Sequence, residues 1–428
     1  DKNDLAVTVF NTLSWGKKFN DAHDVKVLAG YSFESDDKTE FSAKVEGFLG
    51  NELHELNAGS SNPSVAGTSS RSVLMSYFGR VNYGYKDRYL FEGNFRYDGS
   101  SRFAKGNRWG IFPSFSAGWR LSEEEFMKDI PWIYNLKLRA SWGQLGNERI
   151  DLFRYVDLMN LKVIKNDGSI TDYNYPLNGA MQSGAAITAY NDPNITWETT
   201  TMTNVGIDFM ALRNRLTLTA DWYVKNTKDI LLNVPIPIST GGANDPIRNA
   251  GKIRNQGFEF NLGWNESLNK DLSYGVSFLG TYNKNEVVEM GAESQVITGG
   301  TIHGGTYTSR TLAGYPIGGF WLIPTDGYFN STEEVQAHQK DGVLIQPSAE
   351  PGDIRFKDTN NDGTINDEDR VYCGSPFPKF TYSINGNITY KNVDFSIGFQ
   401  GVTGNKIYNA TKLELTDVTR GTNYLAST

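Results

Sequence analysis

The chain has 428 residues, of which 13% are aromatic, and its formal net charge of −8 arises from 49 acidic and 41 basic residues. This acidic balance, without any run of Lys or Arg, argues against nucleic-acid binding. The single cysteine, Cys373, excludes an internal disulfide framework and a cysteine-built zinc site within the chain. No stretch approaches the roughly 18 consecutive apolar residues of a membrane helix.

Many stretches of the chain alternate apolar and polar side chains. A period of two places successive side chains on opposite faces of a β-strand. In residues 89–98, for example, Phe91 and Phe95 fall on one face and Glu92 and Arg96 on the other. The alternation predicts strands over residues 5–16, 23–34, 73–86, 89–98, 111–121, 135–143, 201–210, 215–225, 256–265, 271–283, 380–390 and 393–403.

Short and long connections alternate between these strands. Short joins are predicted at 86–88, 212–214 and 391–392, and a helical turn is expected after Leu121. Strict alternation puts all long loops at one end, which is typical of outer-membrane barrels with short periplasmic turns and long extracellular loops. The long joins are predicted at residues 35–72, 99–110, 144–200, 226–255 and 284–379.

The pattern predicts an all-β fold, an antiparallel transmembrane β-barrel with a polar face that lines a wet interior. A tilted strand of about ten residues is long enough to cross a bilayer. The alternative is a soluble antiparallel sandwich or propeller, which shows the same alternation. The sequence does not show whether the first strand meets the last, so this alternative stays open at this point.

The last long loop contains an acidic stretch that matches the EF-hand type of calcium loop. Asp358, Asn360 and Asp362 occupy the first, third and fifth ligand positions, and Thr364 offers a backbone carbonyl. Asp369 stands at the twelfth position, where the EF-hand has Glu. These residues are candidate ligands for a structural Ca²⁺ that stiffens the loop. The alternative is a solvated acidic turn.

Aromatic residues in the long joins are candidate ligand-binding residues, because aromatic rings stack on sugar rings and on apolar ligand faces. The alternative roles are packing within the loops and membership of an interfacial aromatic girdle. The candidates are Trp109, Tyr175, Trp321, Tyr328 and Phe329.

No catalytic residues are predicted, and the chain is not expected to be an enzyme. The histidines are far apart in the sequence, and no nucleophile-elbow, zinc-protease or phosphate-loop motif occurs. The run of three Glu residues at 123–125 is read as solvated surface beside a turn.

Several long segments resemble the SusC/RagA group of TonB-dependent outer-membrane transporters of Bacteroidota. The resemblance covers nearly the whole chain, residues 1–428, and includes the acidic loop 358–369 within the long loop region 284–379. The segments are DGSSRFAKGNRWGIFPSFSAGWRLSEEEFM (98–127), ITWETTTMTNVGIDF (195–209), RLTLTADWYVKNTKDILL (215–232), RNQGFEFNLGW (254–264) and PGDIRFKDTNNDGTINDEDR (351–370).

The resemblance implies that the chain supplies a middle-to-late portion of a 22-stranded barrel in the outer membrane. The plug domain, the TonB-contacting segment and the terminal strand are then expected outside these residues. The resemblance also implies a SusD-like surface lipoprotein that closes over the barrel as a lid, and import of oligosaccharides or peptides. A dimer of transporter–lipoprotein pairs is part of the same expectation.

Two other functions stay open on the sequence. One is a siderophore or cobalamin receptor of the TonB-dependent type. The other is a calcium-stabilised, glycan-binding β-protein that does not transport.

Overall fold

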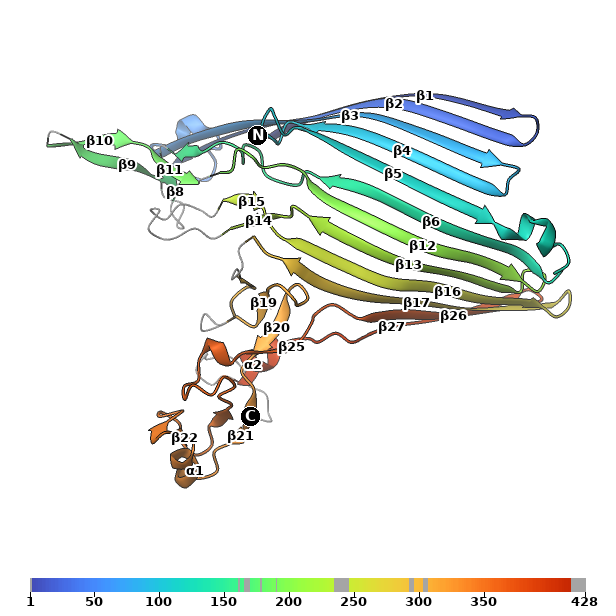
Figure 1. The fold of residues 1–428 in the computed structure, drawn as a ribbon. Helices are drawn as coiled ribbons and strands as arrows, with labels where there is room; N and C mark the ends of the chain where they lie inside the picture. The colour runs from blue at the N-terminus through green and yellow to red at the C-terminus, as the bar shows by residue number, and fades with distance from the viewer. Residues whose placement is uncertain are drawn as a thin grey trace. The chain divides into compact units, whose positions relative to one another are not determined.

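The computed structural model describes residues 2–160, 162–164, 170–177, 179–189, 191–234, 246–291, 296–302 and 307–416. A 12-stranded sheet dominates it (Figure 1). The strands follow one another in sequence order from one edge of the sheet to the other. They are β1 (Lys2–Phe19), β2 (His23–Glu46), β3 (Ser61–Tyr85), β4 (Tyr89–Ser100), β5 (Trp109–Arg120), β6 (Ile133–Asn147), β12 (Glu198–Ala211), β13 (Leu216–Lys228), β16 (Lys252–Ser267), β17 (Leu272–Glu289), β26 (Phe380–Tyr390) and β27 (Val393–Thr403).

The number of strands confirms the sequence prediction of twelve. For β26 and β27 the bounds agree to the residue, because both strands alternate cleanly and the short turn 391–392 separates them. The helical turn expected after Leu121 is also confirmed, as two 3₁₀ helices at Leu121–Glu123 and Glu125–Met127. Among the described residues, no helix has the length and apolar character needed to cross a membrane.

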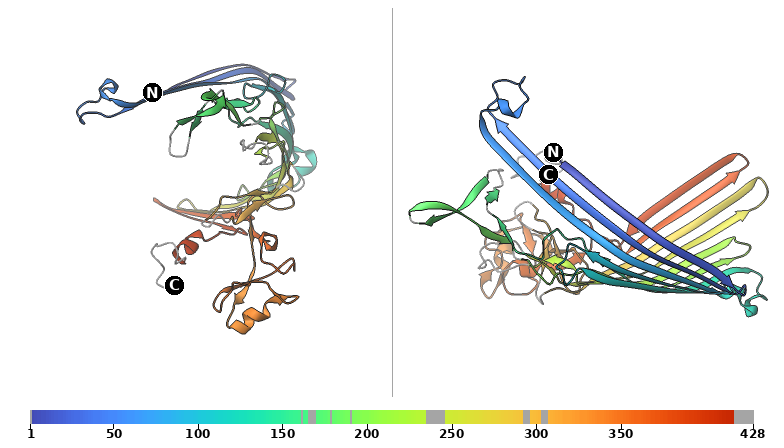
Figure 2. Two further views of the ribbon diagram at one scale, coloured as in Figure 1. Left: turned by 90° about the vertical axis from the view of Figure 1, so that its left-hand side faces the viewer. Right: turned by 90° about the horizontal axis from the view of Figure 1, so that it is seen from above.

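The long join predicted at residues 35–72 is wrong over most of its length. β2 continues to Glu46 and β3 begins at Ser61, so both run past the ends of β1 and β4 (Figure 2). The extension is rich in Ser, Thr, Asp and Lys, and its few apolar residues include Phe41 and Val65, which are exposed. Backbone hydrogen bonds hold the two strands together there, through register pairs from Lys44 with Ser64 to Ser35 with Val73. Backbone pairing holds such strands together without the sustained apolar period from which the other strands were predicted.

The chain divides into two compact units, Asp1–Asn214 with Tyr223–Lys252, and Arg215–Trp222 with Ile253–Thr428. The first unit contains β1–β6 and β12. It also contains small sheets in the loops between the long strands, formed by β7 (Leu158–Asn160) with β11 (Ala186–Ala189), by β8 (Lys162–Ile164), β9 (Ile170–Leu177) and β10 (Ala180–Gly184), and by β14 (Leu231–Asn233) with β15 (Ile247–Asn249).

The second unit contains β16, β17, β26 and β27. Much of the predicted loop 284–379 is folded. It contains the four-stranded sheet β18 (Ile297–Thr298), β19 (Ser309–Thr311), β20 (Gly319–Leu322) and β25 (Val371–Gly374), the pairs β21 (Thr325–Tyr328) with β24 (Ile354–Phe356) and β22 (Gln339–Lys340) with β23 (Val343–Leu344), and the helix α1 (Thr332–Ala337); the helix α2 (Ala410–Thr416) follows β27.

Left-handed backbone conformations form the short turns. Lys86 and Asp87 have φ of 50° and 53° between β3 and β4, and Asn20 and Asp21 have φ of 48° and 49° between β1 and β2. Short polar residues such as Asn and Asp tolerate this region best. In the first unit these turns lie at the same end of the strands, on the right in Figure 1. We call this the turn end and the opposite end the loop end.

A small apolar core lies at the loop end of the first unit. Its buried members are Phe103, Phe112, Ile150, Ile195 and Trp197. The Trp197 ring lies 5.3 Å from that of Phe103 and 5.2 Å from that of Phe112. The core therefore ties the segment between β4 and β5 to the segment that precedes β12.

Candidate functional site

One face of the sheet in the first unit is apolar and exposed. Along β4 and β5 it presents Phe91, Phe95, Ile111 and Phe115, whose side chains are between 48% and 59% exposed. A water-soluble protein rarely leaves so large a contiguous apolar surface uncovered. This face has the character of a surface that contacts lipid.

A row of aromatic rings borders this face at the loop end. Tyr31 lies 5.3 Å from Tyr77, and Tyr97 lies 4.5 Å from Trp109, which also stacks on Tyr77 at 6.2 Å. The register pairs that join these positions place them on the same face as Phe95. This loop-end row has the composition of an interfacial girdle.

A second row borders the face at the turn end. The rings of Tyr85, Tyr89 and Trp119 stack in sequence at 6.2 and 6.3 Å. Eight residues separate Tyr77 from Tyr85, which corresponds to about 27 Å along a strand and about 21 Å across a membrane at a tilt of about 40°. This spacing suits the roughly 25 Å apolar band of outer-membrane barrels.

The opposite face is polar, and its charged groups are bound by neighbouring polar or charged side chains. Arg139 donates from Nε and Nη2 to the two carboxylate oxygens of Asp208, at 2.9 and 3.0 Å. The Asn82 and Asn94 amides donate to Glu92 at 2.5 and 2.8 Å. A charged face with satisfied hydrogen bonds is suited to line a hydrated interior.

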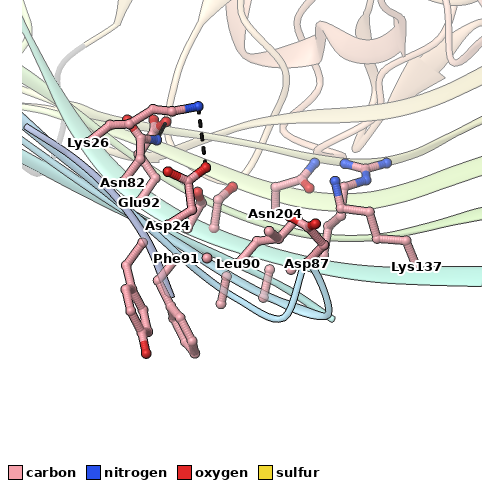
Figure 3. Close-up of a pocket in the computed structure, with 17 residues that line it drawn as sticks. Asp24, Lys26, Asn82, Asp87, Leu90, Phe91, Glu92, Lys137 and Asn204 are labelled. Carbon is pink, nitrogen blue, oxygen red and sulfur yellow. Dashed lines mark hydrogen bonds and ion pairs between the residues drawn. The ribbon is translucent and has the colours of Figure 1, made fainter. Parts of the chain in front are cut away.

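A hollow of about 590 Å³ lies on this polar face, near the turn end (Figure 3). Residues of β2 to β6 and of β12 line it, including Lys26, Glu92 and Asn204, which point to one side of the sheet. Phe91 points to the other side. The close-up thus shows the two-faced wall that the alternation predicts.

The acidic loop in the second unit is wound tightly by its own hydrogen bonds. The Asp362 N–H donates to Asp358 Oδ1 and to Asn360 Oδ1, at 3.0 Å each. Side-chain oxygens of the first and third predicted ligand positions therefore both accept from the backbone N–H of Asp362. Asn361 and Gly363 have φ of 58° and 92°, so the chain reverses at these two residues. The positions predicted to be ligands therefore lie in one tight turn, and their ligand role stays a prediction.

Asp369 joins the beginning and the end of the loop through hydrogen bonds. Its side chain is fully buried, and its two oxygens accept N–H groups from Thr359 at 2.7 Å and Asn366 at 2.8 Å. A buried carboxylate satisfied by two backbone donors has a structural role by itself. A ligand role for Asp369 stays a prediction.

Hydrogen bonds to Asp362 have an electrostatic consequence. The Asn360 side chain, followed by the Thr364 hydroxyl and N–H, lowers the pKa of Asp362 from its ordinary value to about 2. These donors stabilise the charged carboxylate. Asp362 is therefore ionised at neutral pH.

Across the described ranges, no three His, Cys, Asp or Glu side chains gather in a metal-binding arrangement. The acidic loop instead offers two carboxylates, Asp358 and Asp362, together with the Asn360 amide oxygen and the Thr364 carbonyl. Such mixed oxygen sets are typical of calcium loops.

The aromatic candidates lie in different environments. Trp109 belongs to the loop-end row on the apolar face, which is the girdle role named as its alternative. Phe329 is 1% exposed, and its ring packs against His338 at 5.5 Å. Neither placement supports ligand stacking, because one ring faces lipid and the other is buried.

Trp321 packs against Tyr315 at 4.7 Å, within the loop structure of the second unit. Tyr328 is 62% exposed at the end of β21 and keeps a surface that a ligand can contact. Tyr175 lies in β9, and its side chain falls outside the described part of the structure.

The sequence analysis did not predict the loop-end core, which packs the segment between β4 and β5 against the segment before β12. Trp197 and Ile195 lie in one of the recognised motifs, and Phe103 lies in another. The family motifs therefore contain the core residues. Nothing in the sequence alone shows that two segments about 90 residues apart are in contact.

Together, the apolar and polar faces, the two aromatic rows and the short turns define a segment of an outer-membrane β-barrel wall. Residues 3–424 match the family described as TonB dependent receptor-like, beta-barrel. The chain therefore belongs to this family, and it is an outer-membrane protein.

Named relatives agree with this assignment. The chain is 34% identical to the TonB-dependent receptor SusC of Bacteroides thetaiotaomicron over 347 residues, which is 79% of this chain and 32% of SusC. It is 31% identical to the TonB-dependent receptor P26 of Formosa agariphila over 402 residues, 93% of this chain and 39% of that receptor. The chain thus spans about two fifths or less of the length of these relatives.

The fold is similar to that of the RagAB peptide transporter, with a TM-score of 0.75 at 21% identity. The match covers 94% of this chain and 41% of the transporter chain. At this identity the likeness shows the fold alone.

Proposed function

We propose that the complete protein imports oligosaccharides or peptides across the outer membrane, with energy relayed by TonB and with a SusD-like surface lipoprotein as its partner. The observation that carries this proposal is the wall itself, with lipid-type residues outside and paired charges inside. The similarity to the TonB-dependent receptor SusC supports TonB-dependent transport, and the choice of cargo and partner rests on the resemblance of the sequence motifs to the SusC/RagA group. A dimer of transporter–lipoprotein pairs belongs to the same proposal.

Transport fits the chain better than catalysis. The relatives are named as receptors, and charged residues of the polar face are held by neighbouring side chains, Arg139 with Asp208 and Glu92 with Asn94. The need for energy has a physical reason: a ligand bound tightly enough to be scavenged leaves slowly without a conformational change.

We also propose that the acidic loop binds one structural Ca²⁺ through Asp358, Asn360, Asp362 and the Thr364 carbonyl. Its anchoring supports a stiffening role. Tyr307 donates to Asp367 at 2.7 Å, and Arg370 donates to the same carboxylate at 2.7 Å. An ordered loop thus holds the segment next to β19 and β25.

The test is to purify the full-length protein from its own membranes in mild detergent and to identify everything retained by mass spectrometry. Co-purification of a SusD-like lipoprotein with a bound oligosaccharide or peptide would support both partner and cargo. A barrel recovered alone, with an iron chelate or a corrinoid instead, would favour the siderophore or cobalamin receptor.

A further inference from the structure

The lipid-facing side of β4, β5 and β6 is not evenly covered. A groove of about 590 Å³ runs across it. Its floor consists of small residues, Gly93, Ala117 and Ala140, on three neighbouring strands. Ala117 pairs with Ala140 across β5 and β6, while Gly93 is paired with Phe115.

Stacked aromatic rings form the ridges of the groove. Phe115 and Trp142 stack at 6.2 Å with an interplanar angle of 14°, and Tyr83 and Phe91 stack at 6.4 Å with 21°. Each pair bridges two adjacent strands, so the backbone ladder fixes its position. The ridges are therefore pre-formed, and an occupant does not have to order them on binding.

The groove lies close to the membrane interface at the turn end. Phe91 is two residues, or about 7 Å, from Tyr89 of the turn-end aromatic row. Lys86 lies at the same end, with its ammonium group 5.4 Å from the centroid of the Tyr85 ring, and it is exposed. A cation thus lies where the headgroup region begins, in the turn that joins β3 and β4, the two strands that carry the Tyr83–Phe91 ridge.

We propose that this groove is a specific site for one acyl chain of a phospholipid of the periplasmic leaflet, whose phosphate contacts Lys86. Short turns of outer-membrane barrels face the periplasm, so the leaflet follows from the position of the turn. An acyl chain in the groove contacts side chains below it and on both sides. An acyl chain on a flat part of the wall has contacts on one side only. The additional contacts in the groove favour binding there through dispersion and apolar burial.

This inference depends on the outer-membrane location and on no property of the cargo. It concerns the lipid face alone, so it stands or falls independently of the proposed import function.

The experiment uses the full-length transporter in mild detergent, mixed with phosphatidylglycerol and followed by native mass spectrometry. The double variant Ala117→Leu/Ala140→Leu fills the groove with apolar atoms and keeps the face lipid-compatible. We expect the lipid-bound fraction to fall about tenfold, the equivalent of losing burial of about two methylene groups.

Ala29→Leu is the matched control. Ala29 is exposed and pairs with Gly79, which pairs with Phe95, so it lies on the same face outside the groove. It should retain phosphatidylglycerol like the wild type. Lys86→Ala should weaken retention while leaving the groove open.

Heat-modifiable gel mobility shows whether each variant is a folded barrel. Folded variants that all retain as much phosphatidylglycerol as the wild type would overturn the site. Equal losses in Ala29→Leu and in the double variant would also overturn it, because lipid would then bind the whole face without preference.

Discussion

Asp358 is the residue that most directly tests the calcium proposal. It accepts the Gly363 N–H at 2.7 Å and so supports the reversal of the loop as well as the proposed ion. With an affinity of roughly 10⁻³ M, about 10 mM Ca²⁺ should protect the loop about tenfold against local opening. Limited proteolysis of the full-length protein, with Ca²⁺ or with a chelator, measures this protection.

In Asp358→Ala and Asp362→Ala the difference between calcium and chelator should disappear, while heat-modifiable mobility of the barrel is kept. Asp151→Ala, which removes an exposed carboxylate in the loop after β6, is the control and should keep the difference. Cleavage of the wild-type loop that ignores the chelator would remove calcium from the proposal.

Asp362 also predicts a pH dependence. Its pKa is lowered to about 2 by hydrogen bonds that stabilise the charged form, led by the Asn360 amide. A carboxylate with a lowered pKa stabilises the folded loop at pH above its ordinary pKa, and this contribution is lost as the pH falls towards about 2. Hydrogen exchange of residues 358–369, corrected for intrinsic rates, should therefore accelerate between pH 4 and pH 2. Asp362→Asn should reduce this step without abolishing it, because hydrogen bonds from Arg370 and Tyr307 also lower the pKa of Asp367 in the same segment. An unchanged step in the variant would assign it to another carboxylate.

The site residues show where sequence reading succeeds and where it fails. The positions of Asp358, Asn360 and Asp362 follow from local spacing, and the turn they form is local. Trp109 and Phe329 differ because their environments depend on strands and segments elsewhere in the chain. The sequence around an aromatic residue in a predicted loop does not indicate whether its ring faces lipid, a buried core or a ligand.

Among the elements, the segment 101–108 between β4 and β5 depends on Trp197. Besides packing on Phe103 and Phe112, Trp197 donates from Nε1 to the Arg108 carbonyl at 3.0 Å. Trp197→Ala should destabilise this cluster by about 3–5 kcal/mol, as expected for removal of a large buried ring. Hydrogen exchange of residues 101–108 in the full-length protein should speed up accordingly.

Trp197→Phe keeps most of the ring and removes the donor, so it should cost less, with about 1 kcal/mol from the hydrogen bond. Equal exchange in the alanine variant and the wild type would show that the backbone bonds of the segment suffice without the core.

The strands themselves were predictable because the bilayer imposes a period of two. Between the two aromatic rows every second side chain contacts lipid, and β4, β26 and β27 were located closely from that period alone. The period weakens beyond the loop-end row. There β2 continues to Glu46 and β3 begins at Ser61, and apolar residues such as Phe41 and Val65 are few and exposed. Backbone pairing has no sequence signature of its own, so the extension was not predictable.

At the scale of the whole molecule, the two edges of the 12-stranded sheet decide whether residues 1–428 can insert into a membrane by themselves. In the part of the chain that the structure describes, β1 and β27 each have a hydrogen-bonded neighbour on one side only. Unpaired N–H and C=O groups cost several kcal/mol each in lipid, so an open sheet edge does not persist there. Strand number is not the obstacle, because closed barrels are known from 8 strands upwards.

We therefore expect residues 1–428, produced without the rest of the protein, to stay out of the outer-membrane fraction and to lack heat-modifiable mobility. The full-length protein should show both properties, and it is the control. A protease-resistant, heat-modifiable band from residues 1–428 alone would contradict this expectation. It would mean that β1 and β27 pair with each other, so that twelve strands close a barrel that needs no further wall.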